Sequence, residues 1–350
     1  MNPVLILKTG ALGDVLRTTS ILPGLAARYP DLSITWVTAP GATDLVEHHP
    51  LATETLALDP KDARAAERLG EELALRGFQR VLSLDDEDPL CRLASRVADP
   101  AERPGVLSGA FSQPDGSRAY TPDVGPWFDM GLLSVHGKAE ADRRKVANTA
   151  SHAAIYAEMF GIEMGEPELP LDASVVDRAK KRLGLLRGKR LIGLNTGSGG
   201  RWESKKLPVD RTIQLARELD RAQPNQLGFV LLGGPEEAER NEQLTRELGG
   251  QVPLVDTGTS NGLLEFAGLV GELDLLITSD SLALHVAVAR KRPVLCFFAP
   301  TSAAEIELYG RGEKVRSTAP DYCSYAKDAD TSTLTVERLL APALRCLGLS

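Results

Sequence analysis

The chain has 350 residues, with 40 Lys and Arg against 48 Asp and Glu and a formal net charge of −8. At about 150 residues per domain this length predicts two domains, and the acidic balance argues against a general nucleic-acid-binding protein, which usually carries a basic domain. The charge is uneven, because residues 1–175 carry 16 basic and 26 acidic side chains whereas residues 176–350 carry 24 and 22. We therefore expect the second half to hold an anionic ligand.

The cysteines and the apolar runs indicate the compartment. The chain has four widely separated cysteines without any CxxC spacing: Cys91, Cys296, Cys323 and Cys346. This pattern argues against a structural zinc site and is typical of a reducing compartment. The N-terminal apolar run over residues 3–7 is short and Lys8 follows it, so no signal peptide is expected. No apolar run approaches the roughly 20 residues of a membrane span, and we expect a cytoplasmic protein.

Short β-rich runs alternate with helical patterns along the chain, which is typical of α/β architecture with parallel sheets. Residues 104–148 are rich in Pro and Gly with little periodicity, so we expect an irregular stretch there that is functional or mobile. The elements predicted for the first half are strands over 4–7, 33–37 and 81–84, and helices over 15–28, from Pro60 to near Gly77, and over 151–160, with a linker over 165–170.

The second half begins the same alternation again. Its predicted strands cover 191–194, 228–232, 273–278 and 293–298, and its predicted helices cover 174–183, 210–222, 236–248, 262–271, 281–290 and about 333–347. The predicted fold class is α/β, with two Rossmann-like domains whose parallel sheets face a central cleft. Ligands of such sheets bind outside the carboxyl ends of the strands.

The first candidate loop, residues 8–14 (KTGALGD), joins the first predicted strand to the first helix. Gly10 and Gly13 let the backbone turn sharply and approach a ligand closely. Asp14 would lie at the helix N-terminus, where the helix dipole alone favours a carboxylate, and a catalytic role is equally open. A dinucleotide loop is the weaker alternative because GxGxxG is absent.

The second candidate loop, residues 195–206 (NTGSGGRWESKK), follows a predicted strand and precedes Pro208. Its glycines, hydroxyls and cations suit phosphate oxygens, which bind backbone N–H groups and positive charge. It is not a Walker A loop, since GxxxxGK[ST] is absent. A solvated basic turn is the alternative, and the glycine cluster favours phosphate binding. The side chains expected to converge are Thr196, Ser198, Arg201, Lys205 and Lys206.

The third candidate segment, residues 278–285 (TSDSLALH), passes from a strand into a helix. Asp280 or Ser281 can cap this helix, and a packed His285 beside a cap is the plain structural alternative. In the functional interpretation the N–H groups of the helix N-terminus bind a pyrophosphate. Glu236 and Glu237, just past another strand, can bind ribose hydroxyls or serve as first-turn helix residues.

Together and in this order, the segments resemble glycosyltransferase family 9, the ADP-heptose:lipopolysaccharide heptosyltransferases. The resemblance covers nearly the whole chain. It rests on residues 5–16 (LILKTGALGDVL), 193–197 (GLNTG) with 205–208 (KKLP), and 279–285 (SDSLALH) followed by 292–294 (RPV) and 299–301 (APT).

The resemblance implies a GT-B fold in which residues 1–168 bind the acceptor and residues 169–330 bind a nucleotide-sugar. Residues 331–350 would form a helix that packs back on the first domain. It also implies inverting transfer of heptose from ADP-heptose to a saccharide hydroxyl, such as one of the lipopolysaccharide inner core, without an essential metal or a cofactor. A glycolipid acceptor would add peripheral contact with the inner leaflet of the inner membrane, and no nucleic acid is implied.

Carried over by position, the resemblance makes Asp14 the candidate general base and Lys8 and Arg17 acceptor-binding residues. A sugar hydroxyl is a poor nucleophile until a base takes its proton, and inversion needs that base on the face opposite the leaving group. Cations and helix N–H groups would stabilise the charge of the departing diphosphate. The implied donor-binding residues are Thr196, Gly197, Ser198, Lys205, Glu237, Asp280, Ser281 and His285.

Three positions depart from the family pattern. Leu282 stands where many relatives have glycine, Leu207 replaces a common tryptophan, and Cys323 lacks the cysteine neighbours that some relatives carry. Two alternatives on the same fold stay open. One is a nucleotide-sugar 2-epimerase, for which the sequence offers no convincing set of acid and base groups, and the other is a nucleotide-sugar-binding protein without turnover.

An anionic acceptor predicts basic residues in the first half, and yet that half is acidic. The run Asp85-Asp86-Glu87-Asp88 follows a predicted strand, and it could repel an anionic acceptor or bind the hydroxyls of a neutral or cationic one. The candidate basic residues, each of which could equally be a solvated surface charge, are Arg64, Arg68, Arg118, Arg143, Arg144 and Lys145.

Overall fold

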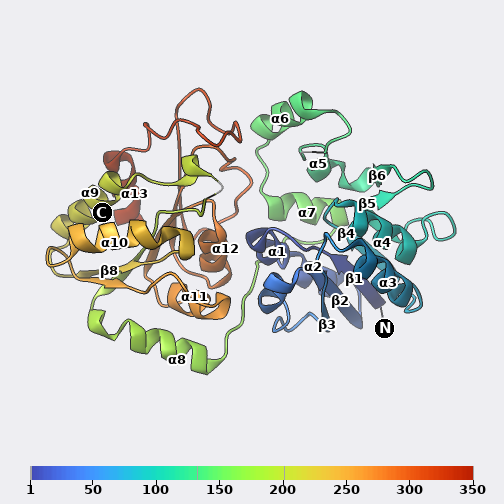
Figure 1. The fold of residues 1–350 in the computed structure, drawn as a ribbon, viewed down its shortest axis with the longest axis horizontal. Helices are drawn as coiled ribbons and strands as arrows, with labels where there is room; N and C mark the ends of the chain where they lie inside the picture. The colour runs from blue at the N-terminus through green and yellow to red at the C-terminus, as the bar shows by residue number, and fades with distance from the viewer. Residues whose placement is uncertain (1, 132, 201, 350) are drawn as a thin grey trace. The chain divides into compact units, whose positions relative to one another are not determined.

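A computed structural model of the protein describes residues 2–131, 133–200 and 202–349. Arg201 of the predicted phosphate loop lies outside the described residues. The chain divides into two compact units, Met1–Leu169 and Pro170–Ser350 (Figure 1). Each unit is built on one six-stranded sheet with helices, which confirms the predicted α/β class with two Rossmann-like domains.

The sheet of the first unit has the strand order β3-β2-β1-β4-β5-β6 and is parallel except for the last pair. The chain leaves the central strand β1 toward β2 on one side and reaches β4 on the other, so the carboxyl ends of β1 and β4 form the switch point where such sheets bind ligands. The elements are β1 (Asn2–Leu7), α1 (Leu12–Thr18), α2 (Ile21–Arg28), β2 (Leu32–Thr38), η1 (Pro40–Leu45), β3 (Glu54–Ala57), α3 (Ala63–Ala74), β4 (Arg80–Ser83), α4 (Asp88–Ala98), β5 (Leu107–Ser112), β6 (Arg118–Tyr120), η2 (Pro122–Val124), α5 (Gly125–Phe128), α6 (Lys138–Ala147) and α7 (His152–Phe160).

The sheet of the second unit has the order β12-β11-β10-β7-β8-β9 and is parallel throughout. Its switch point lies at the carboxyl ends of β7 and β10. The elements are α8 (Ala173–Arg182), η3 (Gly184–Leu186), β7 (Arg190–Asn195), η4 (Glu203–Lys205), α9 (Val209–Ala222), β8 (Leu227–Leu231), η5 (Pro235–Glu237), α10 (Ala238–Leu248), β9 (Leu254–Asp256), α11 (Leu263–Val270), β10 (Leu275–Ser279), α12 (Leu282–Ala289), β11 (Val294–Phe298), β12 (Gly312–Arg316) and α13 (Val336–Cys346).

The predicted helix over 15–28 is two helices, α1 and α2. Pro23 has no backbone N–H, so it cannot donate to the carbonyl of Thr19 as an α-helix requires. The N–H of Leu22 donates to that carbonyl instead, at 3.0 Å, in a tighter turn. The chain therefore bends between α1 and α2, just after the candidate loop.

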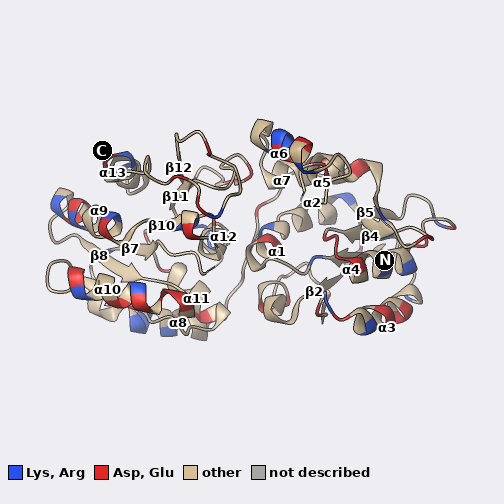
Figure 2. Ribbon diagram, turned by 45° about the horizontal axis from the view of Figure 1, so that its top comes forward, with Lys and Arg blue, Asp and Glu red and all other residues tan. Residues whose placement is uncertain are grey.

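The segment 104–148 is more regular than predicted, since it contains β5, β6, α5 and α6. Helix α6 is mostly charged and has no apolar stripe that a periodicity could reveal. Its stabilisation comes instead from ion pairs three and four residues apart. Arg143 and Arg144 both contact Glu140, at 2.7 and 2.9 Å, and hydrogen bonds from the two guanidinium groups lower the pKa of Glu140 to about 2. Figure 2 shows both signs of charge along this helix.

The terminal helix α13 packs on α9, β11 and β12 of the second unit. Its apolar stripe of Leu339, Ala343 and Leu347 is buried in the core that the sheet of this unit forms. The stripe is thus covered by α9 and by strands that precede it in the chain. The prediction that this helix packs back on the first domain stays a prediction.

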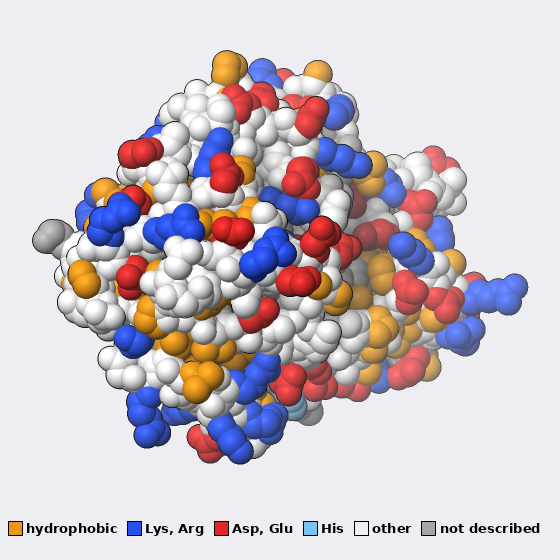
Figure 3. All heavy atoms as spheres, turned by 60° about the vertical axis from the view of Figure 1, so that its left-hand side comes forward, with side chains coloured by type: hydrophobic (Ala, Val, Ile, Leu, Met, Phe, Trp, Pro, Cys, Tyr) orange, Lys and Arg blue, Asp and Glu red, His pale blue; other side chains and the backbone are white. Residues whose placement is uncertain are grey.

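Within the described ranges, no helix is long and apolar enough to cross a membrane. On the face of the molecule drawn in Figure 3, Lys and Arg side chains are interspersed with Asp and Glu. The acidic side chains on that face therefore do not form one continuous negative surface.

Candidate functional site

The loop after β1 is held by a buried carboxylate, Asp85, which lies two residues past the end of β4. Lys8 Nζ forms an ion pair with Asp85 Oδ1. The other oxygen, Oδ2, accepts hydrogen bonds from the Thr9 hydroxyl at 2.9 Å and from the backbone N–H groups of Thr9 and Gly10. Because β1 and β4 are neighbours in the sheet, its topology joins two charges that are 77 residues apart.

The charge on Lys8 is a fixed feature of the site at neutral pH. Burial disfavours the ammonium form, but the carboxylates of Asp85 and Asp14 outweigh burial and raise the pKa of Lys8 above its ordinary value of 10.5. A raised pKa in the folded state stabilises the fold below the unfolded pKa, and this stabilisation is lost only as the pH rises through the folded pKa. Lys8 is therefore protonated throughout the neutral range.

Asp14 lies in the first turn of α1. Its Oδ1 is 2.8 Å from the guanidinium of Arg17, and its Oδ2 accepts the Ala11 N–H at 3.3 Å. The Asp14 side chain is 37% exposed, whereas that of Arg17 is 15% exposed. The Arg17 guanidinium lies over the Trp127 ring, 5.3 Å from its centroid. The carboxylate is thus oriented and still accessible, as a general base must be.

An aromatic cluster in the first unit was not predicted from the sequence. The rings of His152 and Tyr156 are 3.9 Å apart, and Trp127 meets Tyr156 edge-on at 5.6 Å. Tyr156 is fully buried, and its hydroxyl has no hydrogen-bond partner among the described residues. Burial raises the pKa of Tyr156, and the charges of Arg17 and Asp14 also act on it. The four-residue spacing of His152 and Tyr156 on a predicted helix was the available signal.

The acidic run 85–88 has partners within the first unit. Besides Asp85 with Lys8, Asp86 accepts a hydrogen bond from the Tyr120 hydroxyl at 2.9 Å. Asp88 is 2.5 Å from the guanidinium of Arg118. These carboxylates join α4 and the end of β4 to β6, so the run has a structural role beside any effect on an acceptor.

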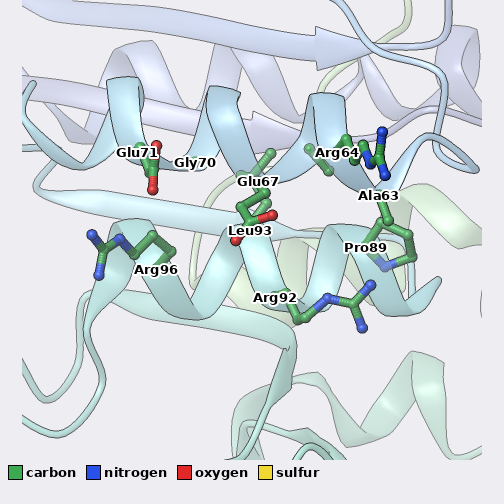
Figure 4. Close-up of a pocket in the computed structure, with 10 residues that line it drawn as sticks. Ala63, Arg64, Glu67, Gly70, Glu71, Pro89, Arg92, Leu93 and Arg96 are labelled. Carbon is green, nitrogen blue, oxygen red and sulfur yellow. The ribbon is translucent and has the colours of Figure 1, made fainter.

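The candidate basic residues differ in their surroundings. Four are paired with carboxylates or buried: Arg118, Arg143, Arg144 and Lys145. Arg64 instead lines a surface pocket of about 430 Å³ between α3 and α4. Figure 4 shows Arg64 and Arg92 at the end of this pocket where both helices begin, with Glu71 and Arg96 at the other end. Both helices begin at the carboxyl edge of the sheet, which is also the edge of Lys8 and Asp14.

In the second unit, Lys205 and His285 gather around Asp280, directly after β10. Lys205 Nζ donates to the Asp280 carbonyl at 2.8 Å and to its carboxylate at 3.1 Å. His285 Nε2 is 3.7 Å from the other carboxylate oxygen. The side chains of Lys205 and Asp280 are 17% and 19% exposed. This edge of the sheet therefore carries a half-buried cation that a ligand can reach.

Ser281 is the residue before α12, but its hydroxyl does not cap the helix. The hydroxyl pairs with Thr278 Oγ1 at 3.0 Å and accepts from Asn195 Nδ2 at 3.5 Å. The first N–H groups of a helix have no partner inside the helix. At α12 the Leu284 N–H donates to the Ser281 carbonyl at 3.1 Å, whereas the Ser281 side chain caps none of the first N–H groups. An anion is an acceptor that helix N-termini favour.

Thr196 and Ser198 hold the glycine-rich loop in place. Thr196 is buried, and its hydroxyl accepts from the Arg240 guanidinium at 2.7 Å. The Ser198 hydroxyl donates to the Trp202 carbonyl at 2.9 Å. Arg240 was not predicted, since an arginine in the first turn of a predicted helix, as in α10, gives no local signal of such a contact. Within the part of the chain that the structure describes, no group of three or more His, Cys, Asp or Glu is placed to hold a metal ion.

Gly197 packs against Glu237, which is only 6% exposed. A Cβ atom at Gly197 would lie 2.8 Å from Glu237 Oε1, so a side chain there would displace the carboxylate. Beside them is a surface pocket of about 450 Å³. It is lined by Ser198, Gly199, Gly200, Gly234, Pro235, Glu236 and Glu237.

Two Rossmann-like units, each with a polar cluster at the carboxyl edge of its sheet, define a GT-B-like protein. Residues 131–335 match the sequence model of glycosyltransferase family 9 (heptosyltransferase). The chain belongs to this family and is a glycosyltransferase.

Solved structures with similar folds extend over nearly the whole chain. A family 9 glycosyl transferase from Veillonella parvula superposes with a TM-score of 0.78 and 18% identity, covering 99% of this chain and 97% of its own. E. coli ADP-heptose lps heptosyltransferase II superposes with a TM-score of 0.67 and 18% identity, and the match covers 99% of this chain and 98% of that protein. E. coli heptosyltransferase WaaC, solved with ADP, superposes with a TM-score of 0.56 and 17% identity, and the match covers 97% of this chain and 99% of that protein.

Proposed function

We propose that this protein is an inverting transferase that moves heptose from ADP-heptose to a hydroxyl of a saccharide or glycolipid acceptor, such as the lipopolysaccharide inner core. The observation that carries the proposal is the gathering of Lys205, His285 and the N-terminus of α12 around Asp280. E. coli heptosyltransferase WaaC, which has the same fold, was solved with ADP and with ADP-2-deoxy-2-fluoro heptose. This supports a nucleotide-sugar donor.

In the proposed reaction, Asp14 accepts the proton of the acceptor hydroxyl as its oxygen attacks the anomeric carbon. The new C–O bond forms on the face opposite the bond to the diphosphate, which breaks and leaves ADP. Arg17 orients the carboxylate through its contact at 2.8 Å. Lys8, held by Asp85, is the proposed contact for the acceptor.

The departing ADP gains negative charge, and the second unit supplies the positive charge that stabilises it. Lys205 and the first N–H groups of α12 are the proposed partners of the diphosphate. Asp280 holds Lys205 and His285 in position, and Ser281 is the residue directly before α12. Thr196, Gly197, Ser198 and Glu237 form the floor of the same site.

For the acceptor we propose that an anionic group binds between Arg64 and Arg92. Both line the pocket at the helix N-termini (Figure 4), where the helix dipoles also favour negative charge. A glycolipid acceptor would place the reaction at the inner leaflet of the inner membrane. Release of ADP that depends on added acceptor tests transfer itself.

Replacing Lys205 with alanine is expected to weaken ADP binding by about 10- to 100-fold, the usual worth of a hydrogen bond to a charged group. Isothermal titration calorimetry with ADP measures this. Lys206→Ala is the matched control, because the Lys206 ammonium pairs with Glu203 at 2.8 Å instead of with Asp280. An equal dissociation constant for Lys205→Ala and the wild type would remove Lys205 from the donor site.

A further inference from the structure

Arg17 contacts an aromatic ring as well as the Asp14 carboxylate. Its guanidinium is 2.8 Å from Asp14 Oδ1, and its Cζ atom lies over the Trp127 ring, 5.3 Å from the ring centroid. Arg17 and Asp14 are three residues apart on α1, whereas Trp127 belongs to α5. The ring therefore contacts this arginine from outside its own helix.

The Trp127 ring is itself held by two rings of α7. It meets His152 at 4.9 Å and 88° and Tyr156 at 5.6 Å and 86°, which are the edge-to-face arrangements that aromatic pairs favour. His152 and Tyr156 are both buried, and α5 packs against α7 within the first unit (Figure 1). The half-buried Trp127 thus has a fixed orientation in which a face of its ring is turned to Arg17.

Helix α5 depends on its neighbours, because four residues are far too few for a helix that is stable alone. The residue that follows it, Asp129, pairs with the Arg144 guanidinium at 2.8 Å and lies 3.1 Å from His136 Nε2. The Ser134 hydroxyl donates to the Asp129 carbonyl at 2.9 Å. The backbone that carries Trp127 is therefore fastened to α6 and to the loop before it.

The surroundings of Arg17 make the ring contact effective. The Arg17 side chain is 15% exposed, and a cation that is mostly removed from water is attracted more strongly by an aromatic face. Burial raises the pKa of Tyr156, so at neutral pH no phenolate competes with Asp14 for the guanidinium. Without the ring, the long arginine side chain would be free to take other rotamers, and a general base needs a closely fixed position.

We propose that Trp127 is a positioning residue for sugar transfer, because its ring holds the Arg17 guanidinium where it orients the Asp14 carboxylate. This inference rests on the proposed function, in which Asp14 is the general base. Trp127 acts through Arg17 and touches neither the acceptor nor the donor. Its loss is therefore expected to lower kcat and to leave the KM for the acceptor unchanged.

The first test compares substitutions at position 127 in the full-length protein. Trp127→Leu is expected to lower kcat by about 3- to 30-fold, the usual worth of a partly buried cation–π contact, with the acceptor KM within about 2-fold. Trp127→Phe keeps an aromatic face and is expected to recover much of this loss. Phe160→Leu is the matched control. It removes a ring that meets Tyr156 at 5.8 Å from the C-terminal end of α7, and its kcat is expected to stay at the wild-type value.

The second test asks whether Trp127 acts through Arg17. In an Arg17→Met background, Trp127→Leu is expected to lower kcat by less than about 2-fold, because the interaction that it removes is already lost. A merely structural role of Trp127 would lower kcat by the same factor in both backgrounds.

The third test keeps the shape of the ring. Trifluorotryptophan incorporated at position 127 fills the same space, so the protein is expected to fold as the wild type does. Its fluorine atoms withdraw electron density from the ring face and weaken the attraction for a cation. A lower kcat is therefore expected at an unchanged melting temperature. Should Trp127→Leu fail to fold, this variant decides the question alone.

The outcomes separate this inference from the proposed function. An unchanged kcat in the fluorinated protein, or equal losses of kcat in the two Arg17 backgrounds, would overturn the inference. A raised acceptor KM at an unchanged kcat would make Trp127 an acceptor-binding residue instead. If Asp14→Asn transfers sugar at the wild-type rate, the assignment of the base is wrong and this inference falls with it. If Asp14→Asn is slow but Trp127→Leu is as fast as the wild type, only the role of Trp127 is wrong.

Discussion

Replacing Asp14 with asparagine is expected to reduce kcat for sugar transfer by about 10²- to 10⁴-fold, the usual contribution of a general base. Asparagine has the same shape but cannot take the proton of the attacking hydroxyl. ADP binding is expected to stay unchanged, because the proposed donor contacts all lie in the second unit. Acceptor-dependent ADP release gives kcat, and calorimetric titration gives the ADP affinity.

Asp88→Asn is the matched control for Asp14→Asn. Asp88 also lies in the first turn of a helix and also pairs with an arginine, so its replacement removes the same kind of helix-dipole and ion-pair stabilisation. We expect its kcat to stay within about 2-fold of the wild type. A surface ion pair contributes only about 0–1 kcal/mol to the stability of the fold, and Asp88 is not the proposed base. Transfer by Asp14→Asn at the wild-type rate would show that another group is the base.

Replacing Asp85 with asparagine is expected to lower the free energy of unfolding by about 3–5 kcal/mol, because it leaves the buried Lys8 ammonium without its counter-charge. Asp85 also holds the backbone of the loop that precedes Asp14, so activity should fall too. Urea unfolding followed by tryptophan fluorescence measures this. Trp36, whose indole donates to the Lys8 carbonyl at 3.2 Å, is one of the three tryptophans that contribute to the signal.

Two further variants separate the ion pair from other effects at the end of β4. Asp86→Asn loses a charged acceptor for the Tyr120 hydroxyl only and is expected to cost less than about 2 kcal/mol. Lys8→Met with Asp85→Leu removes both charges and is expected to recover much of the stability but none of the activity. If the free energy of unfolding of Asp85→Asn lies within about 1 kcal/mol of the wild-type value, the buried ion pair is not what holds the loop.

The parts of the fold that the sequence predicted are those with a strong local pattern. Strands β1, β7 and β10 are buried apolar runs, and each is followed by a polar or glycine-rich loop. Strands β3 and β9 were missed because they are short, half-buried and mixed in composition. Helix α6 was missed because ion pairs, which leave no periodic apolar signal, hold it together.

For the candidate site, too, the sequence predicted only what a local pattern encodes. Asp14, Lys205 and Asp280 lie on predicted loops, so the sequence could place them at sheet edges. The pairing of Lys8 with Asp85 depends on β1 lying beside β4, which no local pattern encodes. The inward turn of Glu237 depends on the space that Gly197 and Gly233 leave, which also needs the folded structure.

The central claim is acceptor-dependent transfer of heptose from ADP-heptose, and a donor panel tests it most directly. The protein is incubated with ADP-heptose, UDP-sugars and GDP-sugars, each with and without a lipopolysaccharide inner-core acceptor, and the released nucleotide and the products are identified. We predict ADP release from ADP-heptose only when the acceptor is present, together with an acceptor lengthened by one heptose in the inverted configuration. Release of UDP or GDP instead of ADP, or isomerisation of a donor without any acceptor, would contradict it.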